Sequence, residues 1–298
     1  MAKVSEVADN IYQIHPELES MFSLSYLVLG EESALIEPGS TTQVDIVLRA
    51  MEEELKFDPT SLSYIIPTHL HMDHGGGVGY MAQKLAQARV VVYERAARHL
   101  VDPTKLIEAT QKAFGQNFAD EFGPILPVPE NQLFQVHGGD KIDLGSRDLE
   151  IIYSPGHATH HICIYDDKSQ GLFCGDALGM YFPDDEAVAV ICPEGFDLDT
   201  ALKTINQLRG LAPKLLFYSH EGIGQDAGKL MQQAEEELRD CGDIVLEALR
   251  AGEDSEQIAQ RLEGYFTSGG STKLNCERRY LDLTVAGYRG YFKKLGLI

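Results

Sequence analysis

The stretch THLHMDHGGG, residues 68–77, packs three histidines and one aspartate into six positions and follows them with three glycines. The segment before it, LSYIIPT, has the apolar run of a buried strand, and VGYMAQKLAQA after it has the spacing of a helix. Binding and catalytic side chains often collect on such connections. Four metal-capable side chains on one turn predict a metal site, because they would otherwise need costly polar partners. The alternative is a polar turn whose histidines are satisfied by hydrogen bonds.

Three more candidate ligands follow, each after a later apolar strand. SPGHATHH supplies His157, LFCGDALG supplies Asp176, and YSHEG supplies His220. Taken singly, a histidine or aspartate at a strand end is more often a cap or a hydrogen-bonded core group than a ligand. Taken together with the first cluster, the three predict one shared site. Imidazole and carboxylate donors without thiolate suit Zn, Fe or Mn.

In this order the four motifs resemble the metallo-β-lactamase fold superfamily, over about residues 8–225. The resemblance implies an α/β fold, an αβ/βα four-layer sandwich with two sheets face to face and helices outside. It also implies two divalent transition-metal ions at one edge of that sandwich. The ligands implied for the first ion are His69, His71 and His157, those for the second are Asp73, His74 and His220, and Asp176 bridges both.

Two cations ~4 Å apart can bind a bridging hydroxide at neutral pH and polarise a carbonyl or phosphoryl oxygen. No separate general base is then required, although Asp73 could take a proton during turnover. His161 lies where many relatives place a histidine that faces the site, so Asp73 and His161 are the candidate catalytic residues. For His161 the alternative is simple packing. Glu37 occupies the place of a family aspartate and is a candidate to orient a ligand imidazole.

Composition narrows the class of protein. The chain has 298 residues and a formal net charge of −21, which argues against nucleic acid or an anionic membrane as a partner. Its start, MAKVSEVADN, does not resemble a secretory signal. We therefore expect a cytoplasmic protein with a small-molecule substrate. Five scattered cysteines without a C-x-x-C pair predict buried thiols, not a disulfide framework.

Patterning along the chain predicts two regions. Residues 1–225 alternate strands and helices and form the metallo-β-lactamase-fold domain, with a helical insertion at about 95–123 that could be a lid or a dimer element. Residues 226–298 form a helical C-terminal cap region. One helical face near the C-terminus predicts core packing, with a homodimer contact as the alternative; it carries Leu281, Val285, Tyr288 and Phe292.

Two functions fit these observations. The first is a dinuclear metal-dependent hydrolase of a small ester, thioester or lactone. The second is a di-iron protein that binds oxygen or nitric oxide as a redox or sensor module, because GDALGMYF and RRYLDLTVAGYRGYFKKLG are similar to a stand-alone subgroup with such members. His71 favours the first function, since the oxygen-handling flavoproteins usually carry an acidic residue there. The missing cysteine ligand disfavours a secreted β-lactamase.

Overall fold

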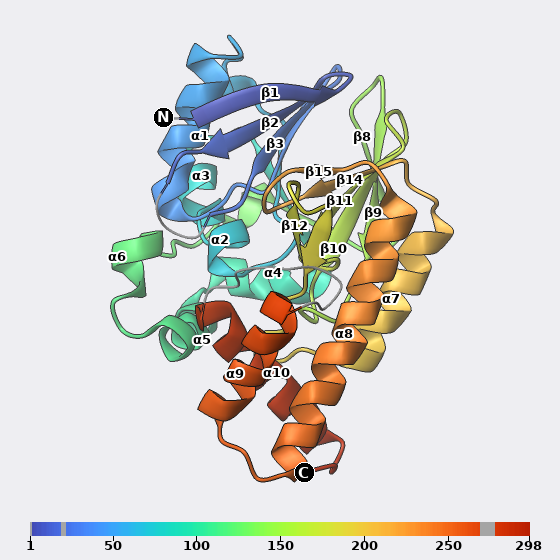
Figure 1. The fold of residues 1–298 in the computed structure, drawn as a ribbon. Helices are drawn as coiled ribbons and strands as arrows, with labels where there is room; N and C mark the ends of the chain where they lie inside the picture. The colour runs from blue at the N-terminus through green and yellow to red at the C-terminus, as the bar shows by residue number, and fades with distance from the viewer. Residues whose placement is uncertain (1, 19–21, 269–277) are drawn as a thin grey trace. The chain divides into compact units, whose positions relative to one another are not determined.

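The computed structural model describes residues 2–18, 22–268 and 278–298, and Figure 1 traces its helices and strands. Contacts within the chain divide it into two compact units. The chain enters the second unit briefly, returns to the first, and then stays in the second. The first unit comprises Met1–Tyr153 and Ile162–Phe173, and the second comprises Ser154–His161 and Cys174–Ile298.

A seven-stranded sheet forms most of the first unit. Its strands lie in sequence order; β1 to β4 pair antiparallel and β4 to β7 pair parallel. The parallel pairs require crossover connections, which explains why helices first appear after β4. The strands are β1 (Ala2–Ala8), β2 (Ile11–Pro16), β3 (Ser25–Leu29), β4 (Ser33–Ile36), β5 (Tyr64–Ile66), β6 (Arg89–Tyr93) and β7 (Leu133–Val136).

Helices α1 (Thr41–Glu53), α3 (Val78–Lys84) and α4 (Glu94–Val101) contact this sheet. Val44 and Val47 of α1 are fully buried in the core that they share with strand residues such as Leu35 and Ile65. Their spacing of three residues places both on one face of the helix, as the sequence predicts.

The insertion is helical, as predicted. Besides α4 it contains α5 (Thr104–Phe114) and α6 (Phe118–Phe122). Phe118, Phe122 and Ile125 form a small apolar cluster with Met72. Met72 begins α2 (Met72–Gly75), the single turn that carries part of the histidine motif. The insertion therefore packs against the helix on which candidate ligands sit.

Strands β8, β9 and β10 of a second sheet, with the first three residues of β11, complete the first unit and pair antiparallel. Tyr26 of β3 meets Phe173 edge to face, with ring centroids 5.3 Å apart, so the two sheets pack together here. Arg147 and Asp166 form a fully buried ion pair, and Arg147 also donates to the carbonyl of Asp9. The strands are β8 (Lys141–Asp143), β9 (Asp148–Tyr153), β10 (Ile162–Asp166) and β11 (Gly171–Gly175).

The second unit begins with short strands and ends in helices. The six-stranded sheet has the order β15-β14-β11-β10-β9-β8, and β12 pairs with β13 in a separate hairpin. From Ala227 onward every assigned element in the described residues is a helix. The elements are β12 (Met180–Phe182), β13 (Ala187–Ala189), α7 (Leu198–Gly210), β14 (Leu215–Tyr218), β15 (Ile223–Gly224), α8 (Ala227–Arg250), α9 (Ser255–Ser268) and α10 (Arg278–Lys294).

The long helix α8 contacts α7, α9, α10 and β13 within this unit (Figure 1). The predicted apolar face of α10 is buried inside the chain, with every one of its four residues at most 4% exposed. That confirms core packing for this face. A homodimer through another surface stays a prediction, as does the domain boundary at residue 225.

Two further expectations concern single residues and helices. The cysteines of the described segments are buried thiols, at Cys163, Cys174, Cys192 and Cys241, and Cys276 lies outside those segments. Among the described residues, no helix combines the length and the apolar character that crossing a membrane requires.

Candidate metal centre

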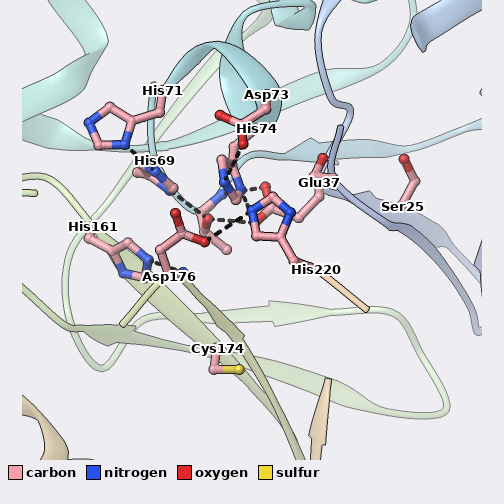
Figure 2. A network of polar contacts seen from close by, with 12 residues as sticks. Ser25, Glu37, His69, His71, Asp73, His74, His161, Cys174, Asp176 and His220 are labelled. Atoms are coloured by element: carbon pink, nitrogen blue, oxygen red, sulfur yellow. Dashed lines mark hydrogen bonds and ion pairs between the residues drawn. The ribbon is translucent and has the colours of Figure 1, made fainter. Parts of the chain in front are cut away.

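The first unit contributes the histidine motif, which follows β5 and enters α2. His74 is fully buried, and its Nδ1 lies 3.0 Å from Oε1 of Glu37, a residue that is 1% exposed. A carboxylate accepts this hydrogen bond, so Nδ1 carries the proton and Nε2 presents a lone pair. Nε2 lies 3.4 Å from Oδ2 of Asp73. Glu37 therefore orients the imidazole of His74, a candidate ligand, and Figure 2 shows its side chain reaching toward that of His74.

Thr68 extends the same network to His69. Its hydroxyl donates to Oε1 of Glu37 at 2.6 Å and lies 3.0 Å from Nδ1 of His69. Because the hydroxyl proton is used on Glu37, Thr68 accepts from His69 Nδ1, which leaves Nε2 of His69 as the lone-pair nitrogen. That Nε2 lies 2.8 Å from Nδ1 of His71. Two ring nitrogens that face each other at this distance need a proton or a cation between them.

The glycines after the motif serve close backbone approach. A Cβ on Gly77 would lie 2.7 Å from the carbonyl oxygen of Ser40 and 2.8 Å from that of Gly39. The two segments are also joined by hydrogen bonds from Gly77 N to Gly39 O and from Gly39 N to His74 O. Only a residue without a side chain fits there. The glycine run thus brings the segment after β4, with Glu37, against the histidine motif.

The second unit contributes Asp176, directly after β11, and His157 and His220. Oδ2 of Asp176 lies 3.4 Å from Nε2 of His157, and Oδ1 lies 3.5 Å from Nε2 of His220. Each carboxylate oxygen therefore faces a different imidazole. The side chain of Asp176 is 14% exposed and that of His220 is 11% exposed. A carboxylate in this setting can offer one oxygen to each of two cations.

His157 and His161 are held by backbone and hydroxyl groups of the same unit. Nδ1 of His157 donates to the carbonyl of Ile191 at 3.1 Å, which leaves its Nε2 as the lone-pair nitrogen. His161 is fully buried, and its Nε2 accepts from the backbone N–H of Asp176 at 3.1 Å. Its Nδ1 then donates to Oγ of Ser154. This arrangement makes His161 a support for Asp176 (Figure 2), and direct catalysis by His161 stays a prediction.

The donor set fits divalent transition metals. His69, His74 and His157 each have Nδ1 bonded to an acceptor, which fixes the ring and directs Nε2 as a ligand atom. The donors are nitrogen and carboxylate oxygen, the types that suit Zn and Fe. Cys174 lies two residues before Asp176 in the sequence, but its thiol donates to the Phe217 carbonyl at 3.3 Å. Sequence reasoning did not identify Thr68, Ser154 or the Ile191 carbonyl, since nothing in the motifs marks such partners.

A family model described as the metallo-beta-lactamase superfamily matches residues 20–220 of this chain. The chain belongs to this superfamily. The metallo-β-lactamase fold, with mixed sheets and a helical C-terminal region, is thereby confirmed. Its structure is similar to that of a metallo-β-lactamase family protein from Thermus thermophilus, with a TM-score of 0.72 and 20% sequence identity. The match covers 98% of this chain and 95% of that one.

Curated relatives of this metallo-β-lactamase-superfamily chain differ in what their names say. The chain is 29% identical over 215 residues to a metallo-β-lactamase fold-containing protein of Sulfurisphaera tokodaii, covering 68% of this chain and 78% of the relative. It is 29% identical over 164 residues to the hydroxyacylglutathione hydrolase of Francisella philomiragia, 53% of this chain and 48% of that one. It is 26% identical over 209 residues to a diflavin flavoprotein of Synechocystis, 70% of this chain but 29% of the relative.

Proposed function

We propose that the protein is a dinuclear metal-dependent hydrolase of a small ester, thioester or lactone. Asp176 carries this proposal, because its two oxygens face Nε2 of two different histidines at 3.4 and 3.5 Å. A carboxylate whose two oxygens face two different candidate ligands can bridge two cations. The family resemblance assigns the metal-capable side chains to two groups, His69, His71 and His157 in the first, and Asp73, His74 and His220 in the second.

The proposed roles follow from these contacts and from the family resemblance. The first group would hold one ion, the second group the other, and Asp176 would bridge them. Two bound divalent ions supply a water of lowered pKa and an electrophile for the substrate carbonyl. Asp73, which is 7% exposed beside His74, can take up the proton released during hydrolysis. His161, itself bonded to Ser154, accepts a hydrogen bond from the backbone N–H of Asp176 and so would keep the bridging carboxylate in position.

Two named relatives support hydrolysis. One is the hydroxyacylglutathione hydrolase of Francisella philomiragia, and another is a probable metallo-hydrolase of Methanocaldococcus jannaschii, 26% identical over 159 residues. An imidazole at His71 completes the histidine-rich ligand set of the first group. Hydrolysis of a carbonyl substrate by such a set requires no redox cofactor.

The second candidate is a di-iron protein that binds oxygen or nitric oxide. The donor set of nitrogen and carboxylate oxygen is compatible with iron as well as with zinc. The match to the Synechocystis diflavin flavoprotein extends over 209 residues, more than the match to the hydroxyacylglutathione hydrolase. A chemotaxis sensor described as a peroxy di-iron species also has the fold, with a TM-score of 0.57 at 16% identity over 78% of this chain.

Metal analysis separates the two candidates. The protein is purified without added metal, its metal content is measured, and its visible spectrum is recorded in air. We expect about two divalent ions per chain. A colourless zinc protein supports the hydrolase, whereas an iron protein with a visible absorption that changes with oxygen supports the alternative. Fewer than two ions in a protein reloaded with zinc or iron contradicts both.

Turnover then tests the hydrolase itself. The metal-loaded protein is assayed on a panel of small esters, thioesters and lactones, beside D176N and a matched control, D184N. Asp184 is exposed on the turn between β12 and β13. We expect D176N to lose at least ~100-fold in kcat/KM, because the amide cannot bridge two cations, while D184N retains activity. Absence of metal-dependent turnover across the panel would refute the proposal.

A further inference from the structure

His157 is oriented by a piece of backbone that belongs to no strand or helix. Its Nδ1 donates to the carbonyl of Ile191, in the irregular segment after β13. A carbonyl in irregular structure positions a ligand only if that segment is itself held. The groups that bond to this segment therefore help to determine the orientation of the His157 ring.

The two peptide N–H groups that flank Ile191 are both bonded to side chains of the C-terminal helices. Val190 N donates to Oε1 of Glu237 in α8 at 2.5 Å, and Cys192 N donates to Oγ1 of Thr284 in α10 at 3.4 Å. Glu237 is 0% exposed and Thr284 is 3% exposed. The Ile191 carbonyl is thus fixed from both sides by residues 46 or more positions away in the sequence.

The backbone of α10 adds a steric restraint on the same segment. A Cβ on Gly287 would lie 2.0 Å from the carbonyl oxygen of Cys192, so only glycine allows this approach. α10 is in turn joined to α8, because the Tyr288 hydroxyl donates to the carbonyl of Leu238 at 2.6 Å. The two helices and residues 190–192 form one tightly bonded assembly.

Burying the carboxyl of Glu237 costs free energy of folding. Complete burial raises the pKa of its carboxyl to about 8, against the lowering effect of the Val190 N–H, so the group is mainly neutral at pH 7. Within the described residues nothing lies at hydrogen-bonding distance from its other oxygen, Oε2. An apolar residue would fill the same space at lower cost. What the carboxyl provides at this place, and an apolar residue would not, is the acceptor for Val190 N.

We propose that Glu237 and Thr284 are positioning residues for the metal ligand His157, which they act on through the Val190–Cys192 segment and the Ile191 carbonyl. This inference rests on the proposed function, since it takes His157 to be a ligand. It gives the C-terminal helices a role in metal binding although they supply none of the ligands. Loss of either bond would free the Ile191 carbonyl and with it the His157 ring.

The test compares E237L with E237Q. Leucine removes the acceptor at similar volume, whereas glutamine keeps a carbonyl oxygen for Val190 N and places its amide nitrogen where Oε2 stood. Metal affinity is measured by chelator competition with zinc, and the ligand field by visible absorption of the cobalt-substituted protein. Partners of metal ligands typically contribute 10–100-fold in affinity. We expect E237L to weaken the binding of one of the two ions by about that factor and to alter the cobalt spectrum. The metal affinity of E237Q should stay within ~3-fold of wild type.

T284V and T284S form a second pair that leaves Glu237 intact. Valine removes the acceptor for Cys192 N and serine restores it, so a loss of affinity in T284V that T284S rescues supports the proposal even if E237L fails to fold. Folding of each apo-protein is checked by circular dichroism. Folded E237L or T284V with wild-type affinity and cobalt spectrum overturns the inference while the proposed function stands. Wild-type protein that binds fewer than two ions overturns the proposed function, and this inference with it.

Discussion

At the scale of single residues, Glu37 is the acceptor on which the motif of the first unit depends. Its Oε1 receives the hydroxyl of Thr68 and Nδ1 of His74, and its Oε2 lies 3.3 Å from Thr68 N. Its φ of 57° is uncommon for a residue with a side chain, and such backbone strain is often found at functional sites. The longer glutamate stands in the place of the family aspartate and orients the imidazole of His74, a candidate ligand.

We therefore expect E37Q to weaken metal binding by about 10–100-fold, because the amide replaces one acceptor oxygen by a donor that opposes Thr68 N or His74 Nδ1. Chelator competition on the purified variant measures the change. E52Q, which alters an exposed glutamate of α1, is the matched control and should bind as wild type does. Equal affinities for E37Q and E52Q would rule out the orienting role of Glu37.

Glu237 also predicts a pH dependence of stability. Its folded-state pKa of about 8 lies above the ordinary value of 4.5, so the folded protein retains a proton that the unfolded chain releases. The group therefore destabilises the fold as pH rises from about 4.5 to 8, by at most ~1.4 kcal/mol for each pH unit. E237Q removes this effect. Its free energy of unfolding, measured by urea titration, should rise relative to wild type across that interval.

The neighbouring exposed residue provides the control for that experiment. Glu236 lies on the solvent side of α8 and accepts only from Gln232 in the hydrogen bonds found there. E236Q should follow the wild-type curve at every pH. A constant difference between E237Q and wild type from pH 5 to pH 8 would mean that the folded state does not raise the pKa of the Glu237 carboxyl.

Residues differ in how far the sequence reveals them. The candidate ligands could be selected because each stands in a local motif at the end of an apolar strand. Glu237 could not, because its bond to Val190 joins positions 47 residues apart. In the sequence it is one of three consecutive glutamates in a helix, where two exposed or half-exposed neighbours look the same. Only packing distinguishes the buried one.

At the scale of elements, the helical insertion braces α2. Phe122 is 0% exposed and packs in the cluster that includes Met72, which lies between His71 and Asp73 in the sequence. Thr42 of α1 also donates to the carbonyl of Glu121, which joins the insertion to the first helix. The sequence predicts a lid or a dimer element for the insertion. These contacts add a third role, that of a support for the histidine motif.

The brace predicts a loss of stability and of metal affinity in F122A. Removing a buried phenylalanine side chain typically costs about 3–5 kcal/mol, part of it from the cavity left behind. Urea unfolding should show that loss, and chelator competition should show weaker binding because α2 is less firmly held. D120A, on the exposed side of α6, should change neither property by a measurable amount. Unchanged metal affinity in a folded F122A would restrict the insertion to a purely structural role.

Most elements followed from hydrophobic periodicity, and the exceptions have physical causes. β1 has the sequence AKVSEVA and lies at the sheet edge, paired only with β2, so it needs few apolar residues and gives a weak strand signal. β12, β13 and β15 are two or three residues long, too short for any period to register. Their hydrogen bonds are set by partners elsewhere in the chain.

At the scale of the whole molecule, the excess of acidic residues complicates any measurement of metal binding. A net charge of −21 attracts divalent cations to exposed carboxylates without a specific site. Specific ions bind the folded state, so they stabilise it by an amount that grows with free metal concentration, about 2.7 kcal/mol at 100 times Kd. Diffuse binding to carboxylates occurs in the unfolded chain as well and contributes little.

We therefore expect a chelator to lower the Tm of the purified protein and stoichiometric zinc to restore it. D176N should respond weakly to both treatments, because it lacks the proposed bridging carboxylate, whereas D184N should respond as wild type does. Scanning calorimetry at fixed ionic strength measures all three. A Tm that is insensitive to chelator in wild type would contradict a specific metal centre.

The close approach of Gly287 to the carbonyl of Cys192 has a consequence for protein engineering. An exchanged C-terminal helix must carry glycine at position 287, since the peptide at Cys192 tolerates no methyl group opposite it. A chimera that changes position 237, 284 or 287 should therefore also carry the residues 190–192 that match its new helices. Substitutions in residues 190–192 and in the facing positions of α8 and α10 should accordingly depend on one another in their effect on stability.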